Sequence, residues 1–248
     1  MAKKEANVPS KETPRSILPQ PSNSLAFLQR VSIFGGLGSE ALGRISAATG
    51  EKVYSKRSII FHEGDPGDTL YILKSGRVKI SKITEDGREK TLTIMQPGDF
   101  FGEMAIFDSL PRSATAEVID DQAVTFTLNK RDFERIILDN PVIALKIMRD
   151  LTRRIRQVNQ QVEDLAFKDV HERVASTLCN LSKVEGRSLG GNRILITLKM
   201  THQDLANMVG SSRETVTRAL NRLQDQEIIS IAHQQITINK PEVLAAWR

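Results

Sequence analysis

The sequence predicts an α+β protein in three parts: a small β-roll of the jelly-roll type, one long helix, and a winged helix-turn-helix. Three observations predict this class. Short alternating apolar segments separated by glycines occupy residues 53–128, which is typical of a small barrel or roll. An apolar heptad pattern follows over residues 141–167, as in a helix that pairs with another helix. Two capped helical segments then flank a glycine turn at Gly210, as in a helix-turn-helix.

Composition and charge describe a globular protein. The chain has 248 residues, of which 40% are hydrophobic and 26% are charged, so it is long enough for one or two domains. Its formal net charge is +5 and its pI is about 9.4, which permits a nucleic-acid partner without requiring one. No apolar run reaches the roughly 18 residues of a membrane span, and residues 1–16 lack a signal-peptide core. We therefore expect a cytoplasmic protein without a membrane partner.

The sequence contains no recognisable metal-binding motif and no recognisable catalytic nucleophile motif. Cys179 is the only cysteine and the four histidines lack metal-ligand spacing, so we expect no zinc, iron–sulfur or other metal site. No serine–histidine–aspartate or cysteine–histidine arrangement is apparent either, which predicts a binding protein rather than an enzyme.

The first part of the chain divides into an arm and a roll. Residues 1–23 are rich in lysine, proline and serine and have no periodicity, which predicts a disordered arm. The roll domain is expected over residues 24–140, beginning with two short helices in residues 24–49 and continuing with strands. Asp86–Gly87 predicts a hairpin turn. Further turns are expected at Gly64, Gly67, Gly76 and Gly98.

One segment of the roll carries a candidate binding site. Residues 101–117 read FGEMAIFDSLPRSATAE. A Gly102–Glu103 step lets backbone amides approach a ligand closely, and the fork of Arg112 matches the oxygens of a phosphate or carboxylate. The short apolar segment between them predicts one or two helical turns. We therefore expect half of an anion-binding site here.

Residues 141–167 predict a long dimerisation helix. Apolar residues recur at alternating spacings of four and three over three repeats, which favours a parallel coiled-coil dimer. The alternative is a helix packed on its own domain, but so narrow an apolar face leaves most of the helix for water. The seam consists of Ala144, Met148, Leu151, Ile155, Val158, Val162 and Leu165.

The last part, residues 168–248, predicts a winged helix-turn-helix. Thr201 with Asp204 predicts the start of one helix, Gly210 its end, and Ser211 or Ser212 the cap of the next. The second helix then exposes polar residues near its beginning, where this motif reaches base edges. The residues we expect to contact DNA are Thr201, Ser211, Ser212, Arg213, Glu214, Thr217 and Arg218. The terminal strand QQITI predicts the wing.

These segments together resemble the CRP/FNR family of bacterial transcription regulators, and the resemblance covers nearly everything from Phe27 to Ile238. Its most specific pieces are GEMAIFDSLPRSA at residues 102–114, LAFKDV at residues 165–170 and VGSSRETVTRAL at residues 209–220.

The resemblance implies a cyclic-nucleotide-binding roll and a role for each matched residue. The residue matching Glu103 accepts from the ribose 2′-hydroxyl in cyclic AMP receptors, and those matching Arg112 and Ser113 bind the cyclic phosphate. The residues matching Arg213, Glu214 and Arg218 read a TGTGA-like half-site, so a homodimer is expected on a palindrome in double-stranded DNA, with RNA polymerase as a further partner. The implied ligand-binding set is Gly102, Glu103, Met104, Arg112, Ser113, Ala114, Val158 and Asn159.

The sequence leaves three alternatives open for the effector. Cyclic AMP is the first expectation because Glu103, Arg112 and Ser113 persist, although Val158 and Asn159 stand where the receptors have two hydroxyl residues that hold adenine. Cyclic di-GMP is the second, with Arg149 and Arg153 on one helix face as guanine-binding forks. The third is an effector-independent regulator in which the pocket is structural and Arg112 pairs with an acid such as Glu103.

Overall fold

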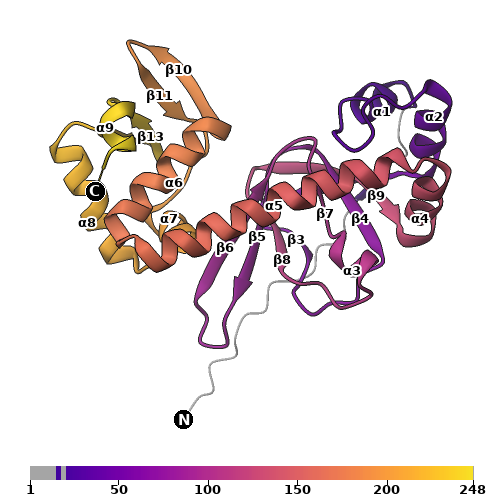
Figure 1. Cartoon of the computed structure of the whole chain (residues 1–248), viewed down its shortest axis with the longest axis horizontal. Coiled ribbons are helices and arrows are strands. Elements are labelled where there is room, and N and C mark those ends of the chain that lie inside the picture. Colours follow the sequence, from indigo (N-terminus) through magenta and orange to yellow (C-terminus); the bar gives the residue numbers. More distant parts are fainter. Residues whose placement is uncertain (1–14, 18–20, 248) are drawn as a thin grey trace. The chain divides into compact units, whose positions relative to one another are not determined.

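The computed structural model describes residues 15–17 and 21–247 (Figure 1). The described chain divides into two compact units, the residues up to 82 together with 92–150, and residues 83–91 together with 151–247. The division falls within a long helix, after Asp150. The predicted domain boundaries after residues 140 and 167 therefore stay predictions.

The predicted roll is built from two antiparallel sheets, and all of it except residues 83–91 lies in the first unit. One sheet has the strand order β1-β2-β9-β4-β7 and the other β3-β8-β5-β6. The elements are α1 (Pro21–Leu28), α2 (Ser39–Ala48), β2 (Gly50–Ser55), β3 (Ile59–Phe61), β4 (Thr69–Ser75), β5 (Val78–Ile83), β6 (Glu89–Met95), β7 (Phe100–Phe101), α3 (Met104–Phe107), β8 (Thr115–Val118), β9 (Gln122–Asn129) and α4 (Lys130–Asp139). The strands lie where alternation predicted them, and α3 is the expected short helix.

The arm predicted to be disordered contains one strand and the start of a helix. Strand β1 (Arg15–Ile17) pairs antiparallel with β2, with Arg15 opposite Val53 and Ile17 opposite Glu51, and α1 begins at Pro21. The prediction is therefore wrong for residues 15–17, where pairing with an available sheet edge supplies order that local composition does not indicate. It is also wrong for residues 21–23, which form the start of a helix. The rest of the predicted arm lies outside the described residues.

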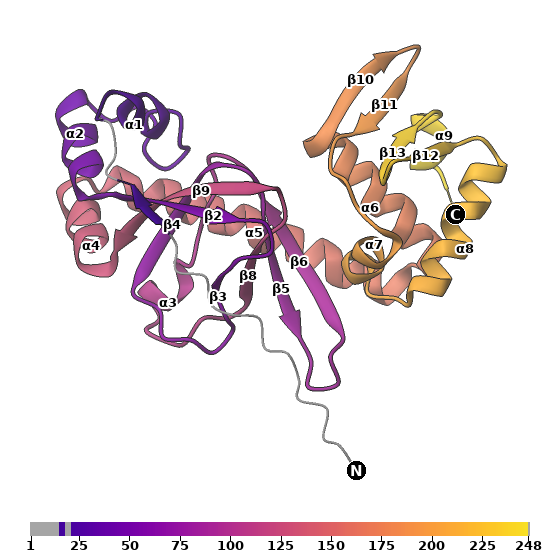
Figure 2. The same cartoon turned by 180° about the vertical axis from the view of Figure 1, so that it is seen from behind.

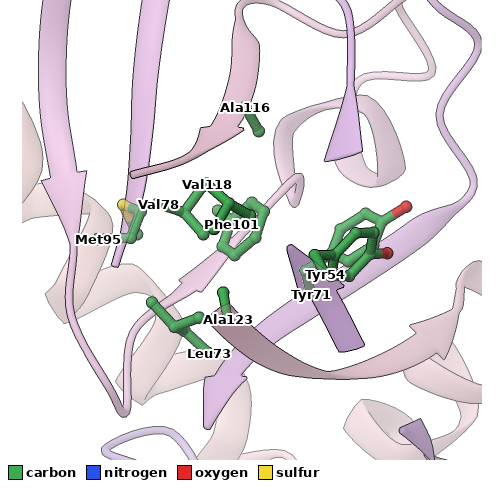
Figure 3. Packing of buried hydrophobic residues seen from close by; sticks show 9 residues of the cluster. All are labelled: Tyr54, Tyr71, Leu73, Val78, Met95, Phe101, Ala116, Val118 and Ala123. Atoms are coloured by element: carbon green, nitrogen blue, oxygen red, sulfur yellow. The ribbon is translucent and has the colours of Figure 1, made fainter. Parts of the chain in front are cut away.

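A buried apolar cluster fills the roll beside the predicted anion site. It brings together side chains from β2, β4, β5, β6, β7, β8 and β9 (Figure 3). Both tyrosines of the chain, Tyr54 and Tyr71, belong to it and are 6% and 8% exposed. Figure 3 shows their hydroxyl groups pointing to the same side of the cluster. The side chains drawn there are Tyr54, Tyr71, Leu73, Val78, Met95, Phe101, Ala116, Val118 and Ala123.

The predicted long helix is α5 (Val142–Phe167), an uninterrupted helix of 26 residues (Figure 1). Ile143 and Ile147 near its start are buried. Farther along, five members of the predicted heptad seam are between 47% and 60% exposed on the single chain. An apolar stripe of this length is costly to leave in water, so the helix has a face suited to a partner helix. These five residues are Met148, Ile155, Val158, Val162 and Leu165.

The second unit contains a helix-turn-helix and a four-stranded antiparallel sheet of order β10-β11-β13-β12 (Figure 2). Its elements after α5 are α6 (Val170–Glu185), β10 (Gly186–Gly190), β11 (Arg193–Ile196), α7 (His202–Val209), α8 (Arg213–Asp225), β12 (Ile229–Ala232), β13 (Gln235–Ile238) and α9 (Pro241–Ala245). Strand β10 lies in the glycine-rich segment GRSLGGN, whose composition by itself is typical of a loop. The segment is a strand because it pairs with β11, and the turn is confined to Gly190–Asn192, where all three residues have positive φ.

Within the described part of the chain, no helix has both the length and the apolar character needed to cross a membrane.

Candidate functional site

The predicted anion site begins where β7 turns into α3. Gly102 adopts a left-handed conformation with φ of +79°, which glycine tolerates at little cost. A Cβ atom at this position would lie 2.6 Å from Nη1 of Arg112 and 3.2 Å from the carbonyl oxygen of Thr69. Glycine is therefore required both by the backbone and by the close approach of Arg112. Glu103 follows directly and is only 5% exposed.

Arg112 lies in the centre of this turn. Its Nη1 donates to the carbonyl oxygen of Gly102 at 2.6 Å and its Nη2 to that of Thr69 at 2.8 Å. The backbone of Arg112 is fixed as well, since its amide donates to Asp65 and its carbonyl accepts from Gly64. The main chain of Arg112 is thus fixed, and two carbonyl groups hold the outer end of its guanidinium.

The Nε atom of Arg112 is buried and has no hydrogen-bond partner. The residue as a whole is 5% exposed, and a buried donor without a partner carries a desolvation penalty of about 1–3 kcal/mol. A buried, unpaired donor on a cation is the feature that an anionic ligand would satisfy.

Burial lowers the pKa of Arg112 below its ordinary value because the charged form loses water. Tyr71, then Asp68, Glu103 and Asp65 oppose this effect. Arginine nevertheless keeps its proton in proteins, so the site contains a buried positive charge. Residues that are close enough to influence that charge therefore come from β4, from the turn before it and from the start of α3.

The other predicted members of this segment lie near the surface or in the core. Ser113 is exposed and its hydroxyl donates to Sδ of Met104 at 3.4 Å. Met104 itself is 50% exposed, whereas Ala114 is 4% exposed. The structure therefore brings Gly102, Glu103 and Arg112 together. The Ser113–Met104 pair lies at the solvent-exposed surface beside them.

The predicted residues on α5 are accessible. Val158 is 55% exposed, and Asn159, Arg149 and Arg153 are exposed as well. Their part in ligand binding stays a prediction.

Phe61 and Tyr71, whose positions in the strand pattern predict burial in the core, also contact the site. The Cζ atom of Arg112 lies 4.4 Å from the ring centre of Phe61 and 5.7 Å from that of Tyr71. The strand alternation around both residues predicts burial, and nothing in it indicates contact with an arginine about 40 or 50 residues later.

The helix-turn-helix is capped as predicted. The Thr201 hydroxyl accepts from the Asp204 amide at 3.1 Å, and the Asp204 carboxylate accepts from the Thr201 amide at 2.7 Å. Gly210 ends α7 in a left-handed conformation. Of the two serines considered, Ser212 is the cap of α8, accepting from the amide of Thr215 at 3.2 Å. These caps fix the start of both helices.

The first turns of α8 present charged side chains to solvent. Arg213, Glu214 and Arg218 are exposed, while Val216 and Leu220 on the opposite face are fully buried. The pKa of Glu214 is lowered, first by a backbone hydrogen bond at the helix start and then by the Ser212 hydroxyl. Two arginines and a carboxylate therefore lie together on the accessible face, and side chains of these types are donors and acceptors toward base edges in the major groove.

Thr217 lies differently from the other predicted DNA contacts. Its Oγ1 is 2.8 Å from Nδ1 of His202, the first residue of α7. The hydroxyl therefore links the two helices of the motif. Sequence spacing places Thr217 on the polar side of α8 but gives no sign of this partner.

Comparison with known proteins identifies two domain families in this chain. The cyclic nucleotide-binding domain family matches residues 51–140, and the Crp-like helix-turn-helix domain family matches residues 172–247. The chain is 37% identical over 219 residues to a CRP-like cAMP-activated global transcriptional regulator of Mycobacterium tuberculosis, covering 88% of this chain and 97% of that protein. It is 37% identical over 186 residues to the cAMP-activated global transcriptional regulator CRP of Pasteurella multocida, covering 75% and 88%.

Solved structures are similar over most of their length. The global regulator CLP of Xanthomonas campestris, described as c-di-GMP responsive, has a TM-score of 0.71 at 28% identity, covering 81% of this chain and 99% of that one. A CRP/FNR family transcriptional regulator of Thermus thermophilus has a TM-score of 0.66 at 27% identity, covering 80% and 99%. With both domain families matched in order, the chain belongs to the CRP/FNR family of transcription regulators.

Proposed function

We propose that this protein is a homodimeric, sequence-specific DNA-binding regulator whose affinity for DNA is controlled by cyclic AMP bound in the roll. The observation that carries the proposal is Arg112, a buried cation with an unpaired Nε donor behind a glycine turn. Such a site fits the phosphate of a cyclic nucleotide, since phosphate supplies both the negative charge and the missing acceptor. No step in this function is catalytic.

Cyclic AMP is the first candidate effector because the sequence contains Glu103, Arg112 and Ser113, the residues implied to bind its ribose and phosphate. In addition, relatives at 37% identity are described as cAMP-activated. In this assignment Arg112 and the amides at the start of α3 hold the phosphate, and Glu103 accepts from the ribose. Asn159 takes over the base contact that Val158 cannot make.

Cyclic di-GMP is the second candidate, favoured by the similarity to CLP and by two accessible arginines one helical turn apart on α5. Arg149 and Arg153 would then hold the guanines as planar forks. An effector-independent regulator, in which Arg112 serves only the fold, is the outcome if neither nucleotide binds.

Dimerisation through α5 follows from its exposed seam. Five apolar side chains between 47% and 60% exposed lie along one helix at heptad spacing, and pairing with a second copy removes them from water. The α8 helices of the two copies, the second helix of each helix-turn-helix, would then bind a TGTGA-like palindrome. For the ligand to regulate this complex, it must bind two states of the dimer with different affinities. Such a regulator acts in the cytoplasm, with RNA polymerase as its next partner.

The test is DNA affinity measured by fluorescence anisotropy on a labelled TGTGA palindrome, with cyclic AMP, with cyclic di-GMP and without either. We expect a nucleotide-dependent change in affinity that is lost in Arg112→Ala. Arg213→Ala should weaken DNA binding about 10- to 100-fold, corresponding to about 1–3 kcal/mol. Arg222→Ala removes the same charge from the last turn of the same helix and serves as its control. If neither nucleotide changes the affinity for DNA, the regulatory proposal is contradicted.

A further inference from the structure

The guanidinium of Arg112 lies on an aromatic surface. Its Cζ atom is 4.4 Å from the ring centre of Phe61, at the end of β3, and 5.7 Å from that of Tyr71 in β4. A cation within about 6 Å of a ring centre is attracted to the electron-rich face of the ring. The rings of Phe61 and Tyr71, from two different strands, thus form an aromatic surface against the guanidinium.

This aromatic surface packs against the buried core of the roll. Phe61 packs against the buried cluster of the roll. Its ring centre is 5.6 Å from that of Tyr71 and 6.0 Å from that of Phe101, and the last two rings stack at 5.3 Å with an angle of 14°. Tyr71 and Phe101 are 8% and 2% exposed, respectively, and both are drawn in Figure 3. Rings packed in this way leave Phe61 little freedom to move.

The hydrogen bonds of Arg112 do not fix the guanidinium by themselves. The bonds to Gly102 and Thr69 hold two nitrogen atoms on the outer end of the fork, while Nε is unpaired. Rotation about the line through these two atoms changes the direction of Nε–H. A ring against the face of the guanidinium opposes that rotation, so Phe61 sets the plane in which the free donor points.

We propose that Phe61 is a positioning residue for the anion site: its ring holds the Arg112 guanidinium in the plane that lets Nε–H meet an oxygen of a cyclic phosphate. This inference rests on the proposed function, because the phosphate is that of the regulatory nucleotide. Phe61 acts through Arg112 and does not itself bind the phosphate. The role requires an aromatic face, so an aliphatic side chain of similar size does not replace it.

The experiment is isothermal titration of the full chain with cyclic AMP and with cyclic di-GMP, for wild type, Phe61→Leu and Phe61→Tyr. We expect Phe61→Leu to weaken the nucleotide that wild type binds roughly tenfold, and Phe61→Tyr to stay within about twofold of wild type, since tyrosine presents a similar face. In an Arg112→Lys background, which removes the fork, Phe61→Leu should have little further effect. Equal affinity of wild type and Phe61→Leu overturns the inference, as does an equal loss in the leucine and tyrosine variants.

A matched control separates this role from general packing. Phe126 in β9 is fully buried and lies under a different cation, with Nζ of Lys74 5.1 Å from its ring centre. Phe126→Leu removes a comparable ring from the same roll and should lower the melting temperature without changing nucleotide affinity. If it weakens nucleotide binding as much as Phe61→Leu does, the effect is one of packing and the inference fails.

A readout without nucleotide distinguishes this inference from the proposed function. In protein labelled with ¹⁵N-arginine, the Nε–H resonance of Arg112 is identified by its loss in Arg112→Lys. Phe61→Leu should shift that resonance, because the ring current is removed, while Phe126→Leu should leave it in place. If wild type binds neither nucleotide, the proposed function fails, and an Nε–H resonance unmoved by Phe61→Leu then rejects the positioning role as well.

Discussion

Adding one methyl group at Gly67 should displace the central arginine of the anion site. A Cβ atom there would lie 2.6 Å from Nε and 2.8 Å from Cζ of Arg112, and 2.7 Å from Cβ of Ala105. All three distances are about 1 Å shorter than normal carbon contacts. The backbone of Gly67 does not have a positive φ, so the effect of alanine comes from contact alone.

The loss of stability and affinity in Gly67→Ala depends on which neighbouring group moves away from the added methyl group. Ala105 belongs to α3 and is 3% exposed, so its methyl group cannot yield without shifting the helix. The Arg112 side chain yields instead and gives up its place between Gly102, Thr69 and Phe61. Overpacking of this kind costs about 1–3 kcal/mol in stability. If the nucleotide loses a similar amount, its affinity falls about 10- to 100-fold.

Gly67→Ala is tested by titration with the nucleotide that wild type binds, together with a thermal melt. Gly98→Ala is a control for stability, since its φ of +98° strains alanine while nothing lies within 4 Å of the added methyl group. Gly98→Ala should melt at a lower temperature and bind normally. If Gly67→Ala also binds like wild type, the packed position of Arg112 is irrelevant to the ligand and our reasoning is refuted.

Three further predictions concern the dimer, the DNA-binding unit and the tyrosines. Val158→Glu places a charge in the exposed seam of α5 and should reduce the mass measured by light scattering at low concentration from twice 27.7 kDa to 27.7 kDa; an unchanged dimer mass counts against pairing through α5. Thr217→Val and His202→Ala should each lower the free energy of unfolding by about 1 kcal/mol, and the double variant should lose no more than either single one, whereas additive losses would show that the hydrogen bond contributes nothing. Burial is the main cause that raises the pKa of Tyr54 and of Tyr71 above 10, so in ultraviolet titration the folded protein should keep both hydroxyls protonated above pH 10. Because the unfolded chain ionises near pH 10, stability should be complete below that pH and fall as pH rises above it; tyrosinate forming with a midpoint near 10 in folded protein contradicts this burial.

Local signals explain which parts of the fold are predictable from the sequence. The caps of α7 and α8 involve residues three positions apart, so Thr201 and Asp204 can be recognised without tertiary information. The seam of α5 is equally local, since one helix supplies all its members. By contrast, β1 and β10 are strands because a neighbouring edge pairs with them, and local composition does not indicate such pairing.

The candidate site divides in the same way. Gly102 and Arg112 are ten residues apart in one motif, and the motif predicts their proximity. The contact of Arg112 with Phe61 depends on how β3 and β4 pack inside the roll, which strand alternation does not determine. The bond between Thr217 and His202 depends on the angle between two helices. Each of these partners was missed because the contact is tertiary.

The most direct measurement is isothermal titration of the purified full chain with cyclic AMP and, separately, with cyclic di-GMP, repeated on Arg112→Ala. We predict saturable binding of cyclic AMP to wild type and its loss in the variant, because the variant removes the buried cation and its unpaired donor. Saturable binding of cyclic di-GMP alone, also lost in the variant, would keep the anion site and change its ligand. Binding that survives Arg112→Ala, or no binding of either nucleotide to wild type, would contradict a regulatory phosphate site at Arg112.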